Sequence, residues 1–421
     1  MSEIIFHIDV NSAYLSWSAL EKLKNKGEID LRTIPSIIGG DEKSRHGVVL
    51  AKSVPAKIYG IVTGEPVAMA LRKCPTLILE PPDHRIYDEY SKRLMNLLLT
   101  YTSDLEQLSV DECFLNFGPI AHLYESPEAA AQIIKNTVKN ELGFTVNIGI
   151  APNKLLAKMA SDFQKPDRVH TLYKEEIPQK MWPLPVGDLY MVGKSSVHRL
   201  EQLGIRTIGE LANTDVNFLI AHFKSHGQQM WNHANGIGSD HVDSSAREAK
   251  GIGNSTTLRE DAATSQAAKQ ILLHLAESVS RRLRTAGQTA GSITVEIRYN
   301  TFENTSHQTT LPSHTNATNT IYECACRLFD ELWDKRPIRL LGIRTTKLLE
   351  EGAPVQLSLF DLPSSNMGKT HTVPTAADKD KVPAFSATTE ERRQKLDDAI
   401  DTIRKKYGNE AVIRGSFLRK D

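Results

Sequence analysis

Two adjacent carboxylates, Asp111 and Glu112, stand out in this chain because they interrupt the apolar run of residues 105–117. The apolar residues around them suit a strand with little solvent on either face. Neighbouring residues of a strand point to opposite faces, and an unpaired buried carboxylate is very costly, so such a pair requires cations. A turn between the two strands of a hairpin would let both side chains converge on one point. A solvated acidic hairpin tip is the alternative.

A third carboxylate, Asp9, ends the apolar strand that is predicted to begin at Ile4, and a helix is predicted to begin at Ser12. Catalytic residues often lie at the ends of strands in α/β sheets. Asp9 would therefore stand beside Asp111 and Glu112 if the two strands are neighbours. Three carboxylates around one point form an all-oxygen site for a divalent metal ion. Two metal ions in such a site activate an attacking oxygen and stabilise a leaving one in phosphoryl transfer.

The combination of Asp-Val-Asn-Ser-Ala-Tyr at residues 9–14 with Ser-Val-Asp-Glu at 109–112 resembles the Y-family DNA polymerases, the lesion-bypass enzymes, and in particular their bacterial polymerase IV-like group. Residues 35–40, 55–61 and 149–166 resemble that family as well. The likeness is dense up to about residue 235 and thinner, but in register, through about residue 350. It implies a multi-domain α+β fold, a right-hand polymerase with an α/β palm, fingers, a helical thumb and a C-terminal α+β little finger.

The resemblance also divides the chain into domains. The expected ranges are palm 1–12 and 79–170, fingers 13–78, thumb 171–235 with a helix-hairpin-helix, linker 236–247, little finger 248–350, and a tail 351–421 that holds a clamp-binding motif at 356–360, a disordered segment at 363–387 and a helix at 388–407. In the little finger, strands are predicted over 292–299 and 338–348 and helices over about 264–285 and 315–334, from periods of two and 3.6 residues. In the tail helix, Leu396, Ile400, Ile403 and Tyr407 form one apolar stripe.

The activity that the resemblance implies is template-directed DNA synthesis past damaged bases, with low fidelity. Asp9, Asp111 and Glu112, helped by the Val10 carbonyl, are then expected to hold two Mg²⁺ ions, with primer–template DNA and deoxynucleoside triphosphates as substrates.

Three further residues are expected to bind the nucleotide. Tyr14 stands at the position of the family's steric gate, where an aromatic ring excludes a 2′-hydroxyl, and Lys165 matches a lysine that reaches the phosphates. The common family pattern places a Thr, a Tyr and an Arg on the triphosphate, whereas this chain has Ala51, Val54 and Lys57 there. Lys57 keeps the charge but lacks the fork of an arginine, which puts the grip on the triphosphate in doubt.

The remaining expectations concern DNA and a protein partner. The hairpin of the thumb is degraded, because Met191 stands where the first glycine is expected. The candidates for phosphate contact in the little finger are Arg298, Arg339, Arg344 and Lys347. Residues Gln356, Leu357, Leu359 and Phe360 resemble the pentapeptide that binds the bacterial sliding clamp.

Composition limits the broad class of protein. The chain has 421 residues, enough for several domains, and 51 basic residues against 51 acidic ones. Zero net charge argues against a wholly basic nucleic-acid coat, but not against DNA binding, which depends on the cations that face phosphates. No apolar run suits a membrane span, and four scattered cysteines frame no disulfide scaffold. We expect a monomer of the bacterial cytoplasm. A non-catalytic DNA- or clamp-binding subunit on a polymerase scaffold is the alternative function.

Overall fold

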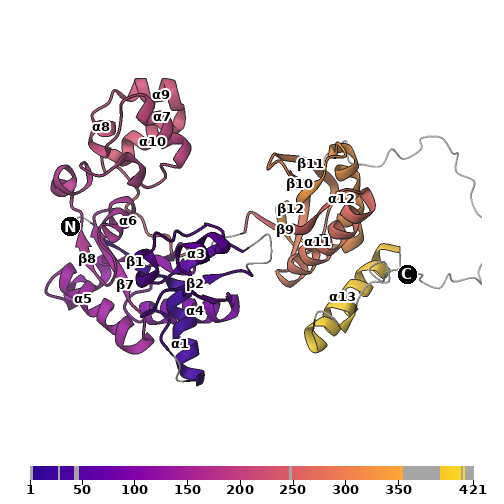
Figure 1. Cartoon of the computed structure of the whole chain (residues 1–421), viewed down its shortest axis with the longest axis horizontal. Helices are drawn as coiled ribbons and strands as arrows, with labels where there is room; N and C mark the ends of the chain where they lie inside the picture. Colours follow the sequence, from indigo (N-terminus) through magenta and orange to yellow (C-terminus); the bar gives the residue numbers. More distant parts are fainter. Residues whose placement is uncertain are drawn as a thin grey trace, which may run out of the picture. The chain divides into compact units, whose positions relative to one another are not determined.

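The structure is a computed structural model that describes residues 3–26, 29–41, 47–245, 249–353, 389–408 and 411–412. The chain divides into two compact units, Met1–Ala246 and Arg247–Asp421 (Figure 1). Residues 356–360 and 363–387, for which a clamp motif and disorder are expected, lie outside the described residues.

A five-stranded sheet forms the centre of the first unit. Its order is β5-β6-β1-β7-β8, with bounds Leu105–Gln107 for β5, Glu112–Asn116 for β6, Ile5–Val10 for β1, Val146–Ala151 for β7 and Val169–Thr171 for β8. The central strand β1 runs antiparallel to both of its neighbours, β6 and β7. The sheet is therefore antiparallel at its core, as the resemblance implies for a palm.

Side chains of β1 alternate between two cores. Phe6 and Ile8 pack with residues of three helices on one face, α1 (Ala13–Lys26), α4 (His84–Leu99) and α5 (Pro127–Thr137). Ile5 points to the opposite face, where α6 (Lys154–Asp162) packs. By the same alternation, His7 and Asp9 point towards the α6 side. The period of the strand thus directs Asp9 to the face that the lysine-rich α6 covers.

A three-stranded sheet, ordered β3-β2-β4, lies in the segment predicted as the fingers. Its elements are β2 (Ser36–Gly39), β3 (Val49–Lys52), α2 (Val54–Lys57), α3 (Val67–Lys73) and β4 (Ile78–Glu80). They enclose a small core of their own, which includes Ile37, Ile61 and Val67. Helix α1, which begins the same predicted segment, instead buries Trp17 in the core of the five-stranded sheet.

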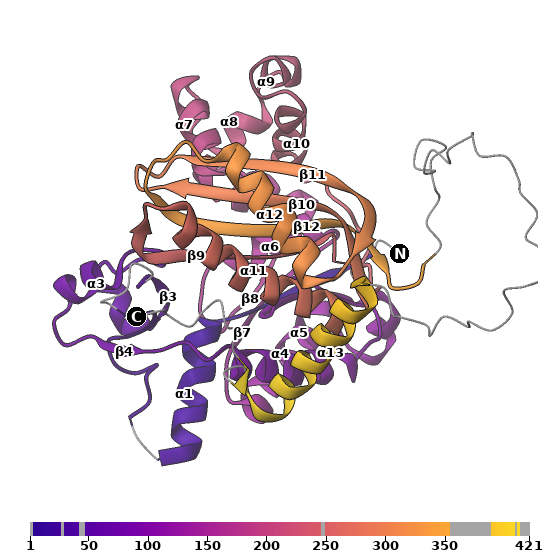
Figure 2. The same ribbon diagram turned by 90° about the vertical axis from the view of Figure 1, so that its right-hand side faces the viewer.

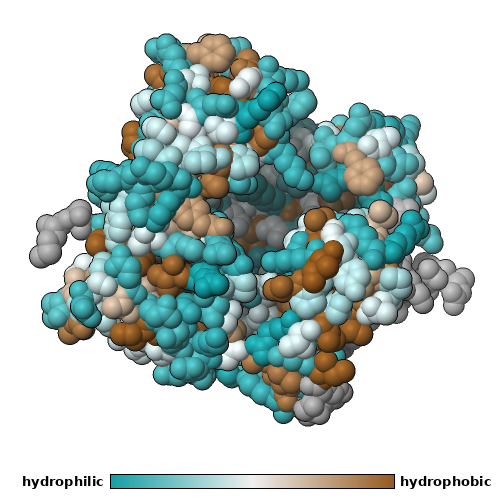
Figure 3. Space-filling view, turned by 60° about the vertical axis from the view of Figure 1, so that its left-hand side comes forward, coloured by the Kyte–Doolittle hydropathy of each residue, from teal (hydrophilic) through white to brown (hydrophobic). Residues whose placement is uncertain are grey.

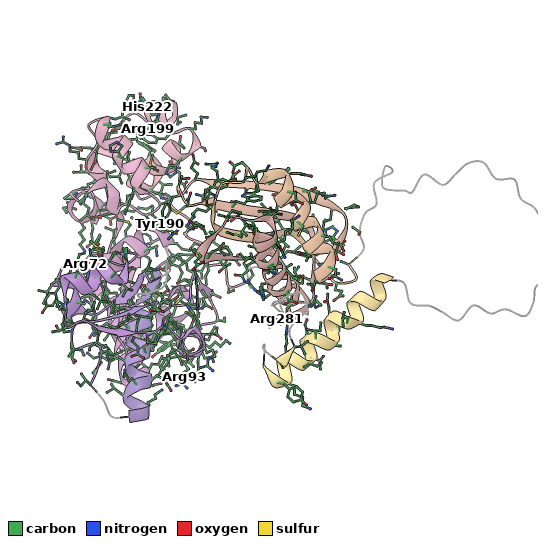
Figure 4. All side chains as sticks on the ribbon, turned by 45° about the vertical axis from the view of Figure 1, so that its right-hand side comes forward. Arg72, Arg93, Tyr190, Arg199, His222 and Arg281 are labelled. Carbon is green, nitrogen blue, oxygen red and sulfur yellow. The ribbon has the colours of Figure 1, made fainter. Side chains whose placement is uncertain are left out.

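Four short helices follow in the segment predicted as the thumb: α7 (Lys194–Gln202), α8 (Ile208–Ala212), α9 (Val216–Phe223) and α10 (Ser225–Ala234). Figure 4 labels Tyr190 at the base of these helices and Arg199 and His222 near their far end. Met191, which precedes α7, has a φ of 73°. A methionine thus adopts the left-handed backbone that the expected glycine would adopt without strain.

The second unit is a four-stranded sheet with two helices on one face. The order is β11-β10-β12-β9, with β9 Gly251–Ala262, β10 Gln288–Tyr299, β11 Asn304–Thr315 and β12 Ile338–Glu350. Helices α11 (Ser265–Thr285) and α12 (Thr318–Leu332) pack on Ile293, Val295 and Ile297, the residues whose alternation predicts β10. The strands β9 and β11 carry mostly polar residues, so no alternation in the sequence indicates them.

The last helix of the described residues, α13 (Thr389–Tyr407), is drawn in yellow in Figure 2. It contacts α11 of the second unit through ion pairs. Asp397 is 5% exposed and accepts a hydrogen bond of 2.9 Å from the Thr318 backbone N–H at the start of α12. Three apolar residues of the predicted stripe, Leu396, Ile403 and Tyr407, are instead exposed at 53%, 38% and 67%. Most of the apolar stripe is thus exposed, and the charged face of the helix makes the contact.

None of the helices in the described part of the chain is long and apolar enough to cross a membrane. In the face shown by Figure 3, apolar side chains are scattered among hydrophilic ones.

Candidate active site

The three predicted carboxylates gather at one end of β1 and β6. Asp9 and Glu112 are direct partners in the antiparallel register of these strands. Asp111 precedes β6, and its carbonyl accepts a hydrogen bond of 3.0 Å from the Val10 N–H. The pairing of two strands that are about a hundred residues apart in sequence therefore brings Asp9, Asp111 and Glu112 together.

A tight hairpin between β5 and β6 places Asp111. The backbone N–H groups of Leu108 and Ser109 both donate to the carbonyl of Glu112. The Ser109 hydroxyl donates to Asp111 Oδ1 at 2.6 Å and so orients this carboxylate. Val110, at the tip, is 38% exposed. The prediction of a turn in this segment is confirmed, since Asp111 lies in the turn and Glu112 begins the strand.

Two cationic or polar side chains hold Glu112. Lys158 of α6 forms an ion pair with Glu112 Oε2, and His7 Nε2 lies 3.1 Å from the same oxygen. The His7 ring is 1% exposed, and its Nδ1 lies 2.7 Å from the Ser161 hydroxyl. The hydrogen bond with His7, followed by that from Lys158, lowers the pKa of Glu112 to about 2 against the opposing effect of burial.

Asp9 has a different environment. Burial raises the pKa of Asp9, and the attraction of Lys165 only partly offsets this effect. The Lys165 ammonium forms ion pairs with both Asp9 and Asp162. Burial opposes the charge of Lys165 too, but the two carboxylates outweigh it and raise the lysine pKa. Burial is thus the dominant effect on the pKa of Asp9, although Lys165 lies beside it.

The donor set fits a hard divalent cation in its chemistry, because it consists of three carboxylates and a backbone carbonyl. In the part of the chain that the structure describes, no three His, Cys, Asp or Glu side chains converge closely enough to hold a metal ion. Each carboxylate has a partner in the protein: Lys165 pairs with Asp9, Lys158 pairs with Glu112, and the Ser109 hydroxyl donates to Asp111. Metal binding therefore requires these ammonium groups to give up the carboxylate oxygens.

A cavity of about 200 Å³ lies beside the start of α1. The two predicted nucleotide-binding lysines, Lys57 and Lys165, both line it, and so does Val54. Its other lining residues are Val10, Asn11, Ser12, Leu15, Ser16, Arg32, Ser53, Thr145 and Pro166. Asn11 Oδ1 is buried and has no hydrogen-bond partner among the described residues. The cavity therefore combines several cations with an oxygen that can still accept a hydrogen bond.

Tyr14, the predicted steric gate, is half-buried near the start of α1. Its ring stacks on Tyr87 with centroids 4.3 Å apart and meets the edge of His84 at 6.0 Å. Tyr14 does not line the cavity that holds the two lysines. Aromatic packing against Tyr87 and His84 thus fixes the orientation of the ring.

The four predicted phosphate contacts of the second unit lie on β10 and β12. Arg298 and Arg344 belong to the face of the sheet away from α11 and α12, because they alternate with Ile297 and Ile343 of the core. The Arg339 guanidinium lies over the Phe302 ring at 4.7 Å, and the Lys347 ammonium donates to the Thr310 hydroxyl at 3.2 Å. The predicted clamp-binding residues 356–360 lie outside the described residues.

Sequence reasoning missed four residues of the site: His7, Arg32, Lys158 and Ser161. His7 stands two residues before Asp9, so the strand period places it on the same face, and this signal was available. Lys158 stands one turn before Asp162 in a helix whose sequence pattern is dominated by its apolar residues. Arg32 carries no local signal, because the cavity that it lines is formed by segments distant in sequence.

Comparisons with known proteins agree with this architecture. Residues 8–162 match the impB/mucB/samB family, and residues 249–359 match the C-terminal domain of that family. DNA polymerase IV of Clostridium acetobutylicum is 48% identical over 421 residues, covering 100% of both chains. DNA polymerase IV 1 of Bacillus subtilis is 35% identical over 422 residues, covering 100% of this chain and 94% of its own.

The fold also has a solved counterpart. A Y-family DNA polymerase chimera of Dbh and Dpo4 superposes with a TM-score of 0.73 and 22% identity, covering 82% of this chain and 99% of its own. This likeness confirms the expected fold, a multi-domain architecture of the mixed α+β class. The chain belongs to the impB/mucB/samB family, the Y family of DNA polymerases.

Proposed function

We propose that this DNA-directed DNA polymerase extends a primer past damaged template bases by two-metal nucleotidyl transfer, with the low fidelity of its family. The observation that carries the proposal is the register of β1 and β6, which sets Asp9 opposite Glu112 with Asp111 adjacent. The cavity lined by Lys57 and Lys165 begins at Val10, the residue that follows Asp9. A cluster of acids beside a cluster of bases suits a substrate whose phosphates carry metal ions.

The proposed roles follow from the surroundings of each residue. Asp9, Asp111, Glu112 and the Val10 carbonyl would hold two Mg²⁺ ions. When bound, these ions would supply the positive charge that activates the primer 3′-oxygen and stabilises the leaving pyrophosphate. Lys165 and Lys57 would neutralise the triphosphate. Lys158 and His7 hold the Glu112 carboxylate before any ion is bound, and Lys158 would release it to the metal ions.

Primer extension with purified protein, primer–template DNA, the four deoxynucleotides and MgCl₂ tests the proposal. Asp111→Asn keeps the shape of the side chain but removes the charge, and we expect it to abolish extension while DNA binding stays nearly unchanged. Asp88→Asn is the control, because Asp88 is 63% exposed on α4 and pairs only with Lys92 among the salt bridges of the described residues. Full activity of Asp111→Asn would refute the mechanism, and an inactive wild type that still binds DNA would favour the non-catalytic alternative.

The proposed partners are DNA, through the open face of the sheet of the second unit, and a bacterial sliding clamp, through residues 356–360. On that sheet Arg298 lies on β10 and Arg344 on the neighbouring strand β12, where Arg344 pairs with Thr294, four residues before Arg298; Glu296 stands between these two positions of β10. Arginines on a twisted sheet contact phosphates without reading bases. We propose the domain ranges given by the resemblance, a monomeric state and a cytoplasmic location on the same basis.

A further inference from the structure

Three cations from three separate segments line the cavity beside α1. Lys57 comes from α2 and Lys165 follows α6, whereas Arg32 lies in the turn that precedes β2. Two of the three positions at which the family commonly contacts the triphosphate are apolar in this chain, since Ala51 is 9% exposed within a core and Val54 has only carbon atoms to offer. The chain therefore offers no hydrogen-bonding side chain at these two positions, and its cavity contains an arginine that no motif accounts for.

Arg32 is held by the protein and not by solvent. Its Nε donates to the two carboxylate oxygens of Asp30 at 2.9 and 3.1 Å, and its Nη2 donates to Asp30 Oδ2 at 2.8 Å. On the other side, Nη1 donates to the Gly143 carbonyl at 2.8 Å. A guanidinium has five N–H groups. These contacts leave one N–H on Nη1 and one on Nη2 without a partner among the described residues.

Arg85 makes the same kind of pair with an aspartate as Arg32 makes with Asp30. The pair alone therefore does not explain why the Arg32 guanidinium lies at the cavity. Arg85 also pairs with the aspartate two residues before it, with Nε and Nη2 contacts to Asp83 at 3.3 and 2.9 Å. The Arg85 side chain is 91% exposed, whereas that of Arg32 is 31% exposed. The same local motif thus occurs once at an open surface and once with the guanidinium fixed at a cavity wall beside two lysines.

We propose that Arg32 binds the terminal phosphates of the incoming deoxynucleoside triphosphate and supplies the grip that Ala51 and Val54 lack. This inference rests on the proposed function and specifies how its substrate is held. A guanidinium binds phosphate oxygens with two parallel N–H groups, which the ammonium groups of Lys57 and Lys165 cannot do. Asp30 and Gly143 fix the guanidinium before the substrate arrives, so binding costs little side-chain entropy. Arg32 holds the substrate and does not touch the reacting atoms.

The first test measures insertion of a single nucleotide. Because Arg32→Gln removes charged hydrogen bonds to the phosphates, it should raise KM for dTTP about 10-fold or more, with kcat within about 2-fold. Arg32→Lys should fall between wild type and Arg32→Gln, because it restores charge but not the fork. Arg85→Gln removes the matched surface fork and should leave both constants unchanged. An unaltered KM in Arg32→Gln would overturn the proposal.

The second test does not depend on catalysis. Titration calorimetry with inorganic tripolyphosphate, on the full chain without DNA, should show binding by wild type and by Arg85→Gln and a loss of about 10-fold or more in Arg32→Gln. A purely structural role predicts the opposite pattern, namely a lower melting temperature with unchanged tripolyphosphate affinity, and that result would also overturn the proposal. If wild type inserts no dTTP but tripolyphosphate binding still depends on Arg32, the proposed polymerase function fails and the role of Arg32 as a phosphate ligand stands.

Discussion

Each carboxylate that β1 and β6 contribute to the site has its own counter-charge. Lys165 pairs with Asp9, and Lys158 pairs with Glu112. Both lysines come from α6 or the segment directly after it. The helix therefore neutralises the end of β1 and β6 before any substrate is present, and it must release the carboxylates when other cations bind.

Replacement of Lys158 should show how far its charge stabilises Glu112. Lys158→Met leaves the partly buried Glu112 with His7 alone, and we expect a loss of about 1–3 kcal/mol in the free energy of unfolding. A divalent cation can replace the missing ammonium, so MgCl₂ should reduce the difference from wild type. Urea unfolding with and without MgCl₂ measures both effects. Lys92→Met, which breaks the exposed pair with Asp88, should cost little in either buffer, and a Lys158→Met defect that ignores MgCl₂ would contradict the shared-site interpretation.

The Tyr14 ring is the proposed steric gate against ribonucleotides. Its ring is packed against Tyr87, so Tyr14→Ala should open space next to the sugar and admit ribonucleotides, with a smaller effect on deoxynucleotides. The measurement is the ratio of deoxy- to ribonucleotide insertion efficiency. Tyr14→Phe keeps the ring and should keep the ratio of wild type. If Tyr14→Ala has that ratio too, the ring is only a core residue.

The strained backbone at Met191 should have a small effect on stability. Its φ of 73° is strained for a residue with a Cβ, and its side chain is 54% exposed, so little packing is lost on removal. Met191→Gly should raise the free energy of unfolding by up to about 1 kcal/mol, the difference between relief of backbone strain and the added entropy of the unfolded chain. Thermal unfolding measures this. A destabilised glycine variant would show that the methionine side chain contributes more than its exposure suggests.

At the scale of elements, the sequence predicts what local periodicity encodes. The strand β10, the helices α11 and α12 and the existence of α13 follow from apolar residues at periods of two or 3.6. The strand β11 does not, because its residues are mainly Thr, Ser, His and Asn. The sequence predicts that Asp9 lies near Glu112 only if their strands are neighbours. That the two residues are direct partners in the register of β1 and β6 is known from the structure alone.

The contact face of α13 shows the same limit. An apolar stripe normally predicts the buried side of a helix, yet Asp397 and Asp401 approach the second unit here. Arg284 of α11 meets both carboxylates, with Nη1 and Nε distances of 3.4 and 2.8 Å, and Arg404 of α13 lies 3.2 Å from Glu277. These partners are more than a hundred residues apart in sequence. No local pattern could have paired them.

Arg284 should therefore anchor α13. The Arg284 side chain is 10% exposed, so its replacement by alanine leaves Asp397 largely buried without the guanidinium, which is strongly destabilising for the contact. We expect faster amide hydrogen exchange in residues 389–407 of Arg284→Ala, while the sheet of the second unit stays protected. Lys269→Ala in the same helix breaks a more exposed pair with Asp330 of α12 and serves as the control. Equal protection of α13 in all three proteins would show that other contacts hold the helix.

At the scale of the whole molecule, the clamp-binding proposal concerns how long the enzyme stays on DNA. A short peptide buries little area and binds weakly by itself, but DNA binding through the folded units raises its effective concentration at the clamp. The double variant Leu359→Ala and Phe360→Ala should lose stimulation of primer extension by a bacterial clamp and keep clamp-free extension. As a control, the double variant Leu396→Ala and Ile403→Ala removes exposed apolar residues of α13 instead. Clamp stimulation that survives in the first variant would refute the motif.

The attachment of α13 has a consequence for how this part of the chain can evolve. Ala353, after β12, and Thr389, at the start of α13, both belong to the second unit. The residues between them therefore connect two points of the same unit, as a loop does. The entropic cost of ring closure grows only with the logarithm of length, about 0.6 kcal/mol for each doubling. Insertions and deletions between residues 353 and 389 should therefore be nearly neutral for the folding of both neighbours. A binding motif placed there can change in position and spacing across generations while the polymerase and its last helix remain intact.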